Sequence, residues 1–249
     1  MQKLRPPPLT HHGPGQFRLA KPGPSRMLLQ KHIVKLIMKR TLALLTLATL
    51  CALPPALLAG AHDEKDFKPL FNGKDLTGWK LRNPNGHHSW SVEPGGILKN
   101  TVEGGVHGTD LVSEAKFLNF TVRYEYMTPE DSNSGFYLRG RHEIQILGDY
   151  KTGKATDTGN GSIYGFKAPD KFITKPARVW QTAEATIIGN RITVIMNGVK
   201  IHDNVECNRA TGGELDNKVT EPGPILLQGD HGTVSFRHIR IKELPPFIK

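Results

Sequence analysis

Residues 132–150, SNSGFYLRGRHEIQILGDY, mix apolar residues with side chains that can transfer protons and bind hydroxyl groups. Side chains alternate faces along a β-strand, so Glu143 and Gln145 share one face of HEIQIL, while Ile144 and Ile146 share the other. A carboxylate suits general acid–base chemistry, and planar amides suit fixed hydrogen bonds to vicinal hydroxyls. The stretch therefore predicts a polar, sugar-binding face backed by an apolar core.

Arg139 is expected to extend this polar face. In GFYLRG it shares a face with Tyr137, and Gly140 permits a tight turn after which the two strands can pair antiparallel. Arg139 would then converge with Glu143 and Gln145. The alternative is that these side chains form only the solvated face of a sheet, with Arg and Glu as a cross-strand pair. The amide content favours the binding face, since Gln and Asn suit fixed hydrogen bonding more than solubility.

Further candidates lie at the ends of other predicted strands. Tyr164 follows a polar, Gly-rich loop, residues 151–161, that is long enough to fold over a site. His231 lies in a Gly-bounded turn after a strand that carries Gln228, and an imidazole titrates near neutral pH. The other candidates for substrate binding are Asn133 and Asp149, at the two ends of the first unit, and Trp180, for which a place in the core is the alternative.

Metal and nucleophile motifs are missing from the sequence. There is no HExxH, paired CxxC, GxSxG or P-loop pattern, and the His residues show no metal-ligand spacing. No cofactor is therefore expected. A divalent cation stays open as an alternative, because Asp149, Asp157 and Asn160 offer oxygen ligands.

The N-terminal part of the chain has the pattern of a secretory leader. Residues 38–61 contain a short basic region, an apolar stretch and a small-residue cleavage site, which predicts a signal peptide cleaved near Ala61. Residues 1–37 are interpreted as a mis-called upstream start, or else as a disordered extension. The expected mature chain, 62–249, is one domain with its core at about 66–244, in a periplasmic or extracellular setting.

Removing this leader changes the charge of the chain. The leader holds nine Lys and Arg and no Asp or Glu, which leaves 24 basic against 23 acidic residues. Nucleic-acid binding is therefore not expected, since it needs a clustered basic face. The apolar stretch is too short to span a membrane and is interrupted by Pro54 and Pro55. Cys207 remains alone and cannot form an internal disulfide.

Short apolar or alternating segments separated by Gly, Pro, Asn and Asp recur from residue 62 to 249, and no helix-length pattern is present. Asn197-Gly198, between ITVIM and VKIHD, predicts a hairpin, because a type I′ turn needs positive φ at both positions. A dozen or so strands with regular turns indicate an all-β protein, an antiparallel sandwich or jelly roll.

The chain resembles the 3-keto-disaccharide hydrolase family over about 66–244. The residues that carry this resemblance are FKPLFNGKDLTGWK (67–80), SNSGFYLRGRHEIQIL (132–147), GSIYGFKAP (161–169), Trp180, the NGV hairpin (197–199) and GPILLQGDHGTVSFRHIRI (223–241). The resemblance implies a concanavalin A-like jelly roll, an exported setting and action on small saccharides oxidised at sugar C3. One departure is Gly148, which stands before Asp149 where many members pass directly from the strand into an Asp.

This substrate class suggests a mechanism. A 3-keto group acidifies the C2 proton, so a base can remove it and the C1 leaving group can depart by elimination before water adds back. Glu143 would be the general base or acid, and His231 the second proton-transfer group. Arg139 and Gln145 would stabilise the enolate oxygen or hold hydroxyls.

Two other classes of protein fit parts of the same pattern. A lectin-like carbohydrate-binding module would use the same amides and aromatic rings on this face. A structural protein would leave the face open to a partner. The enzyme differs from both in requiring Glu143 and a partner such as His231 to converge on one reacting carbon.

Overall fold

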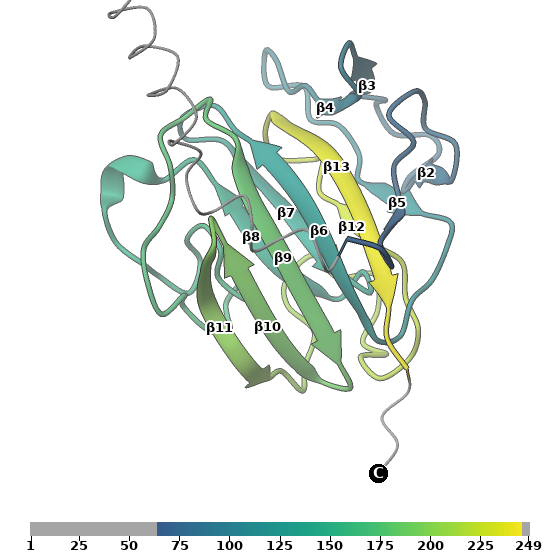
Figure 1. The fold of residues 1–249 in the computed structure, drawn as a ribbon. Helices are drawn as coiled ribbons and strands as arrows, with labels where there is room; N and C mark the ends of the chain where they lie inside the picture. The colour runs from purple at the N-terminus through teal and green to yellow at the C-terminus, as the bar shows by residue number, and fades with distance from the viewer. Residues whose placement is uncertain (1–63, 246–249) are drawn as a thin grey trace, which may run out of the picture. The chain divides into compact units, whose positions relative to one another are not determined.

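Two antiparallel β-sheets build residues 64–245, the part of the chain that the computed structural model describes (Figure 1). The larger sheet has the strand order β11-β10-β9-β6-β13-β4-β3, with β1 also paired to β13, and the smaller has β2-β5-β12-β7-β8. The strands are β1 (Lys68–Pro69), β2 (Trp79–Leu81), β3 (Trp90–Glu93), β4 (Ile97–Asn100), β5 (Leu111–Ser113), β6 (Phe120–Met127), β7 (Asn133–Leu138), β8 (His142–Leu147), β9 (Gln181–Ile188), β10 (Arg191–Met196), β11 (Val199–Glu206), β12 (Leu226–Leu227) and β13 (Val234–Glu243). The expected all-β jelly-roll sandwich is confirmed.

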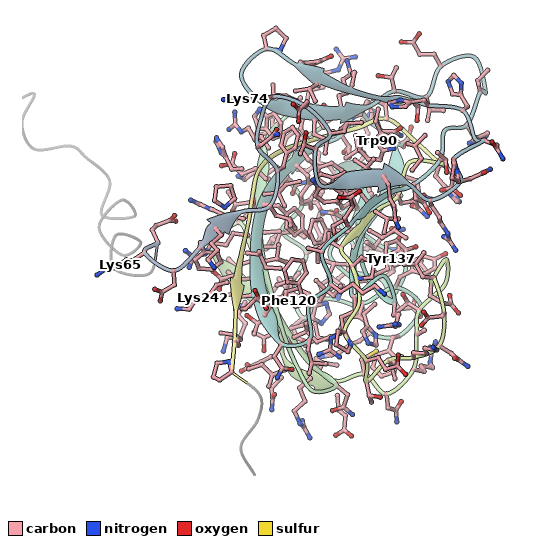
Figure 2. All side chains as sticks on the ribbon, turned by 90° about the vertical axis from the view of Figure 1, so that its right-hand side faces the viewer. Lys65, Lys74, Trp90, Phe120, Tyr137 and Lys242 are labelled. Atoms are coloured by element: carbon pink, nitrogen blue, oxygen red, sulfur yellow. The ribbon has the colours of Figure 1, made fainter. Side chains whose placement is uncertain are left out.

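The core lies between the two sheets. Strand β6 alternates buried and half-buried residues along its whole length, as expected for a strand with one face against a core. Its Tyr124 stacks on Phe136 of β7 with ring centroids 3.8 Å apart, which joins the larger sheet to the smaller one. Figure 2 views the layers from the side, with Phe120 and Tyr137 labelled. Trp79 and Trp90 are buried in the same core.

The predicted Asn-Gly hairpin is confirmed. Strands β10 and β11 pair antiparallel, with Met196 opposite Val199. Asn197 and Gly198 both have positive φ, 51° and 78°, which suits the type I′ turn that joins right-twisted strands.

The predicted pairing of the two strands around Gly140 is also confirmed. Strand β7 pairs antiparallel with β8, with Leu138 opposite His142. The Arg141 N–H donates to the Leu138 carbonyl at 3.1 Å, and Arg139 and Gly140 between them have φ of 55° and 65°. Arg139 and Gly140 are thus the central residues of a β-turn with positive φ at both positions, and Arg141 completes the three-residue connection.

The turn overturns the expected position of Arg139. Because the strand ends at Leu138, the alternation that would place Arg139 beside Tyr137 no longer applies. The fully buried guanidinium donates to the Leu118 carbonyl at 2.6 Å and to the Val219 carbonyl at 2.9 Å. Arg139 therefore ties two loops to the end of the hairpin and does not join the polar face of β8.

Some predictions concern residues outside those described. The signal peptide over 38–61, its cleavage near Ala61 and the extension 1–37 all lie there. Over residues 64–245, the structure contains no helix of the length and apolar character that a membrane crossing requires.

Replacing Arg139 tests its structural role. Arg139→Met should lower the free energy of unfolding by about 3 kcal/mol, since it leaves buried carbonyl groups without donors. Denaturant unfolding measures this loss. Arg178→Met is the control, because Arg178 also has positive φ, 62°, but is exposed. Equal stability of the two variants would contradict the role.

Candidate functional site

The site is built on the face of the smaller sheet that points away from the core. One row of residues in register crosses all five strands, in the order Lys80, Val112, Leu226, Tyr137 and Glu143. Apolar side chains occupy the middle of this row, and Leu215 from a later loop packs on them. Apolar side chains therefore cover the centre of the outer face. The polar side chains of the site lie beside them.

An open cavity of about 210 Å³ lies beside the covered centre. Its wall comes from β7, β8 and three later segments that are far apart in the sequence. The lining residues are Asn133, Tyr137, Glu143, Gln145, Tyr164, Gly212, Gly213, Gln228 and His231. Six of the nine candidates from the sequence, namely Asn133, Glu143, Gln145, Tyr164, Gln228 and His231, are thus brought together.

Glu143 is the buried carboxyl group of this cavity, with only 3% of the residue exposed. Burial raises its pKa to about 8, a hydrogen bond with Tyr137 opposes the rise, and the charges of Asp110 and Asp230 add to it. No Lys or Arg is among the residues that line the cavity. Glu143 is therefore protonated at neutral pH and becomes a comparatively strong base once it ionises.

Gly135 makes room for this carboxyl group. It is paired with Gln145 across the β7–β8 ladder, on the same face as Glu143. A Cβ atom at position 135 would lie 2.2 Å from Glu143 Oε1 and 2.8 Å from the Tyr137 ring. The absence of a side chain here is therefore a requirement of the site.

His231 forms an acid–base pair with its neighbour Asp230. Its Nδ1 lies 2.5 Å from the Asp230 Oδ1, and both side chains are about half exposed. A carboxylate on one ring nitrogen fixes the orientation of an imidazole and leaves the other nitrogen for proton transfer. Of the pair, only His231 lines the cavity, and its side chain is far more exposed than that of Glu143.

The amide groups of the cavity offer acceptors that the described residues do not use. Asn133 Oδ1 and Gln228 Oε1 are buried, and neither accepts a hydrogen bond from another described residue. Buried polar atoms normally have partners, so these two suit a hydroxyl-bearing ligand. Gln145 is instead held in place, since its Nε2 donates to the Thr158 carbonyl at 3.3 Å.

Three predicted binding residues lie elsewhere. Arg139 is buried at the hairpin turn. Asp149 accepts a hydrogen bond from the backbone N–H of Asn160 at 2.9 Å, and so joins the two ends of the 151–161 loop. Trp180 lies against the guanidinium of Arg237, 4.1 Å from its ring centroid, on the larger sheet's β13. None of the three lines the cavity.

The loop that closes the cavity also differs from the prediction. No residue of 151–161 is among those that line it, and the wall comes from Gly212 and Gly213. Tyr137, which strand alternation placed on this face but which was not among the nine candidates, also lines the cavity. Two signals in the sequence pointed to these positions: Tyr137 has the strand parity of Glu143, and a Gly-Gly pair allows close approach of a backbone.

The described residues contain no group of three or more His, Cys, Asp and Glu side chains arranged to hold a metal ion. Two of the oxygens considered for a cation have protein partners. Asn160 Oδ1 accepts hydrogen bonds from the Tyr126 hydroxyl and the Leu147 N–H, and Asp149 Oδ2 accepts one from the Asn160 N–H.

Adding a methyl group at position 135 tests the packing around Glu143. Gly135→Ala should displace the carboxyl group, lower activity by at least about tenfold and cost about 1–3 kcal/mol of stability through overpacking. Kinetic assays and denaturant unfolding measure the two effects. Gly189→Ala is the control for activity alone, because position 189 has open space around it but a φ of 59° that adds backbone strain of its own. A fully active Gly135→Ala enzyme would contradict the assignment.

The raised pKa of Glu143 predicts a dependence of stability on pH. Between its ordinary pKa, 4.5, and about 8, the folded state keeps a proton that the unfolded state has lost. Glu143 therefore lowers the free energy of unfolding progressively as pH rises through this window, by up to a few kcal/mol. Glu143→Gln should match wild type near pH 4.5 and unfold at a higher temperature than wild type at pH 8. A difference that does not change with pH would contradict the raised pKa.

Comparison with known proteins places this geometry in a family. Three crystal structures of candidate glycosyl hydrolases from Parabacteroides distasonis are similar to the chain. One shares 28% identity over 72% of this chain and 84% of its own, with a TM-score of 0.59. A second shares 26% over 72% and 99%, with a TM-score of 0.55. A third shares 23% over 74% and 97%, with a TM-score of 0.60, and supports the fold alone.

No curated protein matches the chain. The family model of the 3-keto-disaccharide hydrolase domain, described as the 3-keto-alpha-glucoside-1,2-lyase-like domain, matches residues 66–242. This span includes every residue that lines the cavity and all of both sheets except the last residue of β13. The chain therefore belongs to the 3-keto-alpha-glucoside-1,2-lyase-like domain family.

Proposed function

We propose that the chain is an exported enzyme that cleaves the glycosidic bond of 3-keto-glycosides by elimination and hydration. Family membership and the similar glycosyl hydrolase candidates support a carbohydrate-active enzyme. The observation that carries the chemistry is the buried carboxyl group of Glu143 in the same cavity as His231. Export rests on the signal-peptide pattern of residues 38–61.

The size and lining of the cavity suit a small saccharide. Its volume of about 210 Å³ is below the roughly 300–1,000 Å³ of sites for drug-sized ligands. The free acceptors of Asn133 and Gln228 can receive hydrogen bonds from sugar hydroxyls, and the ring of Tyr164 can cover a C–H face. With Arg139 absent from the cavity, the donors for a keto or enolate oxygen are amide groups, as at Gln228, or a ring N–H of His231.

Glu143 and His231 carry out the two proton transfers of the cleavage step. The Glu143 carboxylate removes the C2 proton, the C–H electrons form the enolate of the 3-keto group, and their return expels the C1 oxygen. His231, held by Asp230, protonates the departing oxygen. Water then adds at C1, and protonation at C2 restores the 3-keto-sugar.

A single carboxyl group in the cavity favours this chemistry over ordinary glycoside hydrolysis. Ordinary glycosidases place two carboxyl groups on either side of the anomeric centre. Among the lining residues Glu143 is the only carboxyl group. The nearby Asp110 is engaged by Arg82 at 3.0 Å and by the Gly229 N–H. A lectin-like module, the alternative function, would need the amides and rings but no proton-transfer pair.

Turnover of 3-keto-glycosides by the purified chain tests the proposal. Cleavage of 3-keto-trehalose or 3-keto-lactose should release glucose, with a rate that rises with pH up to about 8 as Glu143 ionises. Glu143→Gln should lower the rate by about 10²–10⁴-fold, the typical contribution of a general base. Glu130→Gln, at an exposed glutamate, is the matched control.

The outcomes separate the two functions. Binding of the 3-keto-glycosides without release of glucose, with or without a chelator, would favour the binding module. Undiminished turnover by a folded Glu143→Gln protein would overturn the assigned role of Glu143.

A further inference from the structure

The segment 211–216 forms one wall of the cavity and is tied down along its length. The Thr211 N–H donates to the Arg141 carbonyl, and the Leu215 N–H donates to the Gly140 carbonyl, each at 2.9 Å. Arg82 donates to the carbonyls of Gly213 and Glu214, also at 2.9 Å. The wall is therefore held at both ends by the turn of the β7–β8 hairpin and in the middle by Arg82.

Two further contacts hold the ends of the segment: the Glu143 N–H donates to Thr211 Oγ1 at 2.9 Å, and Arg141 forms an ion pair with Asp216. Tyr137 adds a contact from the cavity side. Its hydroxyl donates to the Gly212 carbonyl at 3.0 Å, and the residue is only 1% exposed. A Cβ atom on Gly213 would lie 2.5 Å from this hydroxyl, so the segment can approach only because that position is glycine. The contact is thus a close and specific junction between β7 and the wall.

The same hydroxyl also serves Glu143. Tyr137 and Glu143 lie opposite each other in the β7–β8 ladder and line the same cavity, so the hydroxyl is a near neighbour of the carboxyl group and opposes the rise of its pKa. A phenol has one hydrogen to donate, so it cannot serve Gly212 and an ionised Glu143 at the same time. When Glu143 is protonated, it can donate to the phenol oxygen while the phenol donates to Gly212.

The charge of Glu143 determines whether the Tyr137 hydroxyl donates to the Gly212 carbonyl or to the Glu143 carboxylate. A hydrogen bond to a carboxylate is about twice as strong as one to a neutral carbonyl. The charged or titratable groups around the junction are Glu143 on β8, Asp110 ahead of β5 with its partner Arg82, and Asp230 with His231 after β12. Burial, with the charge of Glu143, raises the pKa of Tyr137 well above its ordinary value, so the phenol stays a donor throughout.

We propose that Tyr137 is a positioning residue that transfers its hydrogen bond from Gly212 to Glu143 when Glu143 ionises, which loosens the 211–216 wall. This inference rests on the proposed function only in giving Glu143 the role of base. The carboxylate that removes the C2 proton is then oriented by Tyr137, and the wall is free to move in the same ionisation state. Protonation of Glu143 closes the wall again.

Hydrogen exchange of the unliganded full chain tests this coupling. The measured groups are the Thr211 and Leu215 amides, at pH 6.5 and pH 9, after correction for intrinsic exchange rates. Wild type should lose protection by about fivefold to tenfold at pH 9, the value of one hydrogen bond. Glu143→Gln should keep the protection seen at pH 6.5, and Tyr137→Phe should show low protection at both pH values.

A second readout separates positioning from packing. Tyr137→Phe should raise the titration midpoint of Glu143, followed by carboxyl NMR, by about one pH unit, because the ionised form loses its donor. Tyr150→Phe, at a half-exposed tyrosine outside the cavity, should behave as wild type. An unchanged midpoint, or equal loss of protection in wild type and Glu143→Gln, would overturn the inference. Because neither measurement needs substrate, failure to cleave 3-keto-glycosides would leave both results valid.

Discussion

The burial of one carboxyl group, Glu143, is the constraint on which the rest of the site depends. A carboxylate removed from water and placed without a cation beside it is unfavourable, so the group keeps its proton to about pH 8. Three features allow this burial. Gly135 leaves space for the carboxyl group, Tyr137 supplies a neutral hydrogen-bond partner, and the 211–216 segment covers the face.

This constraint explains the mixed composition of strands β7 and β8. Both strands are buried almost throughout, because the larger sheet covers one face and later loops cover the other. The inner face carries Phe136, Ile144 and Ile146, and the outer face carries Glu143 and Gln145. A segment with two buried faces can hold polar groups only if each has a protein partner or is reserved for a ligand.

Local patterns in the sequence predicted much of this arrangement. Strand alternation placed Glu143 and Gln145 on one face, and the Asn197-Gly198 pair located a hairpin, because both depend only on neighbouring residues. Arg139 was misplaced because the β7–β8 turn uses positive φ at that residue, which ends the alternation one position earlier. His142 has the strand parity of Ile144 and Ile146 and is fully buried.

The parts that could not be predicted depend on contacts between distant segments. Gly212 and Gly213 come to lie over Tyr137, 75 residues away in the chain, through ties to the hairpin turn and to Arg82. Trp180 was expected near the sugar, but it follows a loop to the larger sheet and stacks on Arg237. Patterns over a few neighbouring residues do not indicate which distant segments of the chain come into contact.

Transfer of hydrogen at sugar C2 is the measurement that tests the central claim most directly. Cleavage of a 3-keto-glycoside deuterated at C2 can be compared with that of the unlabelled compound, with the product analysed by NMR. The account predicts slower cleavage of the deuterated substrate and solvent hydrogen at C2 of the product, both dependent on Glu143. Equal rates for the two substrates, with deuterium fully retained at C2, would contradict it.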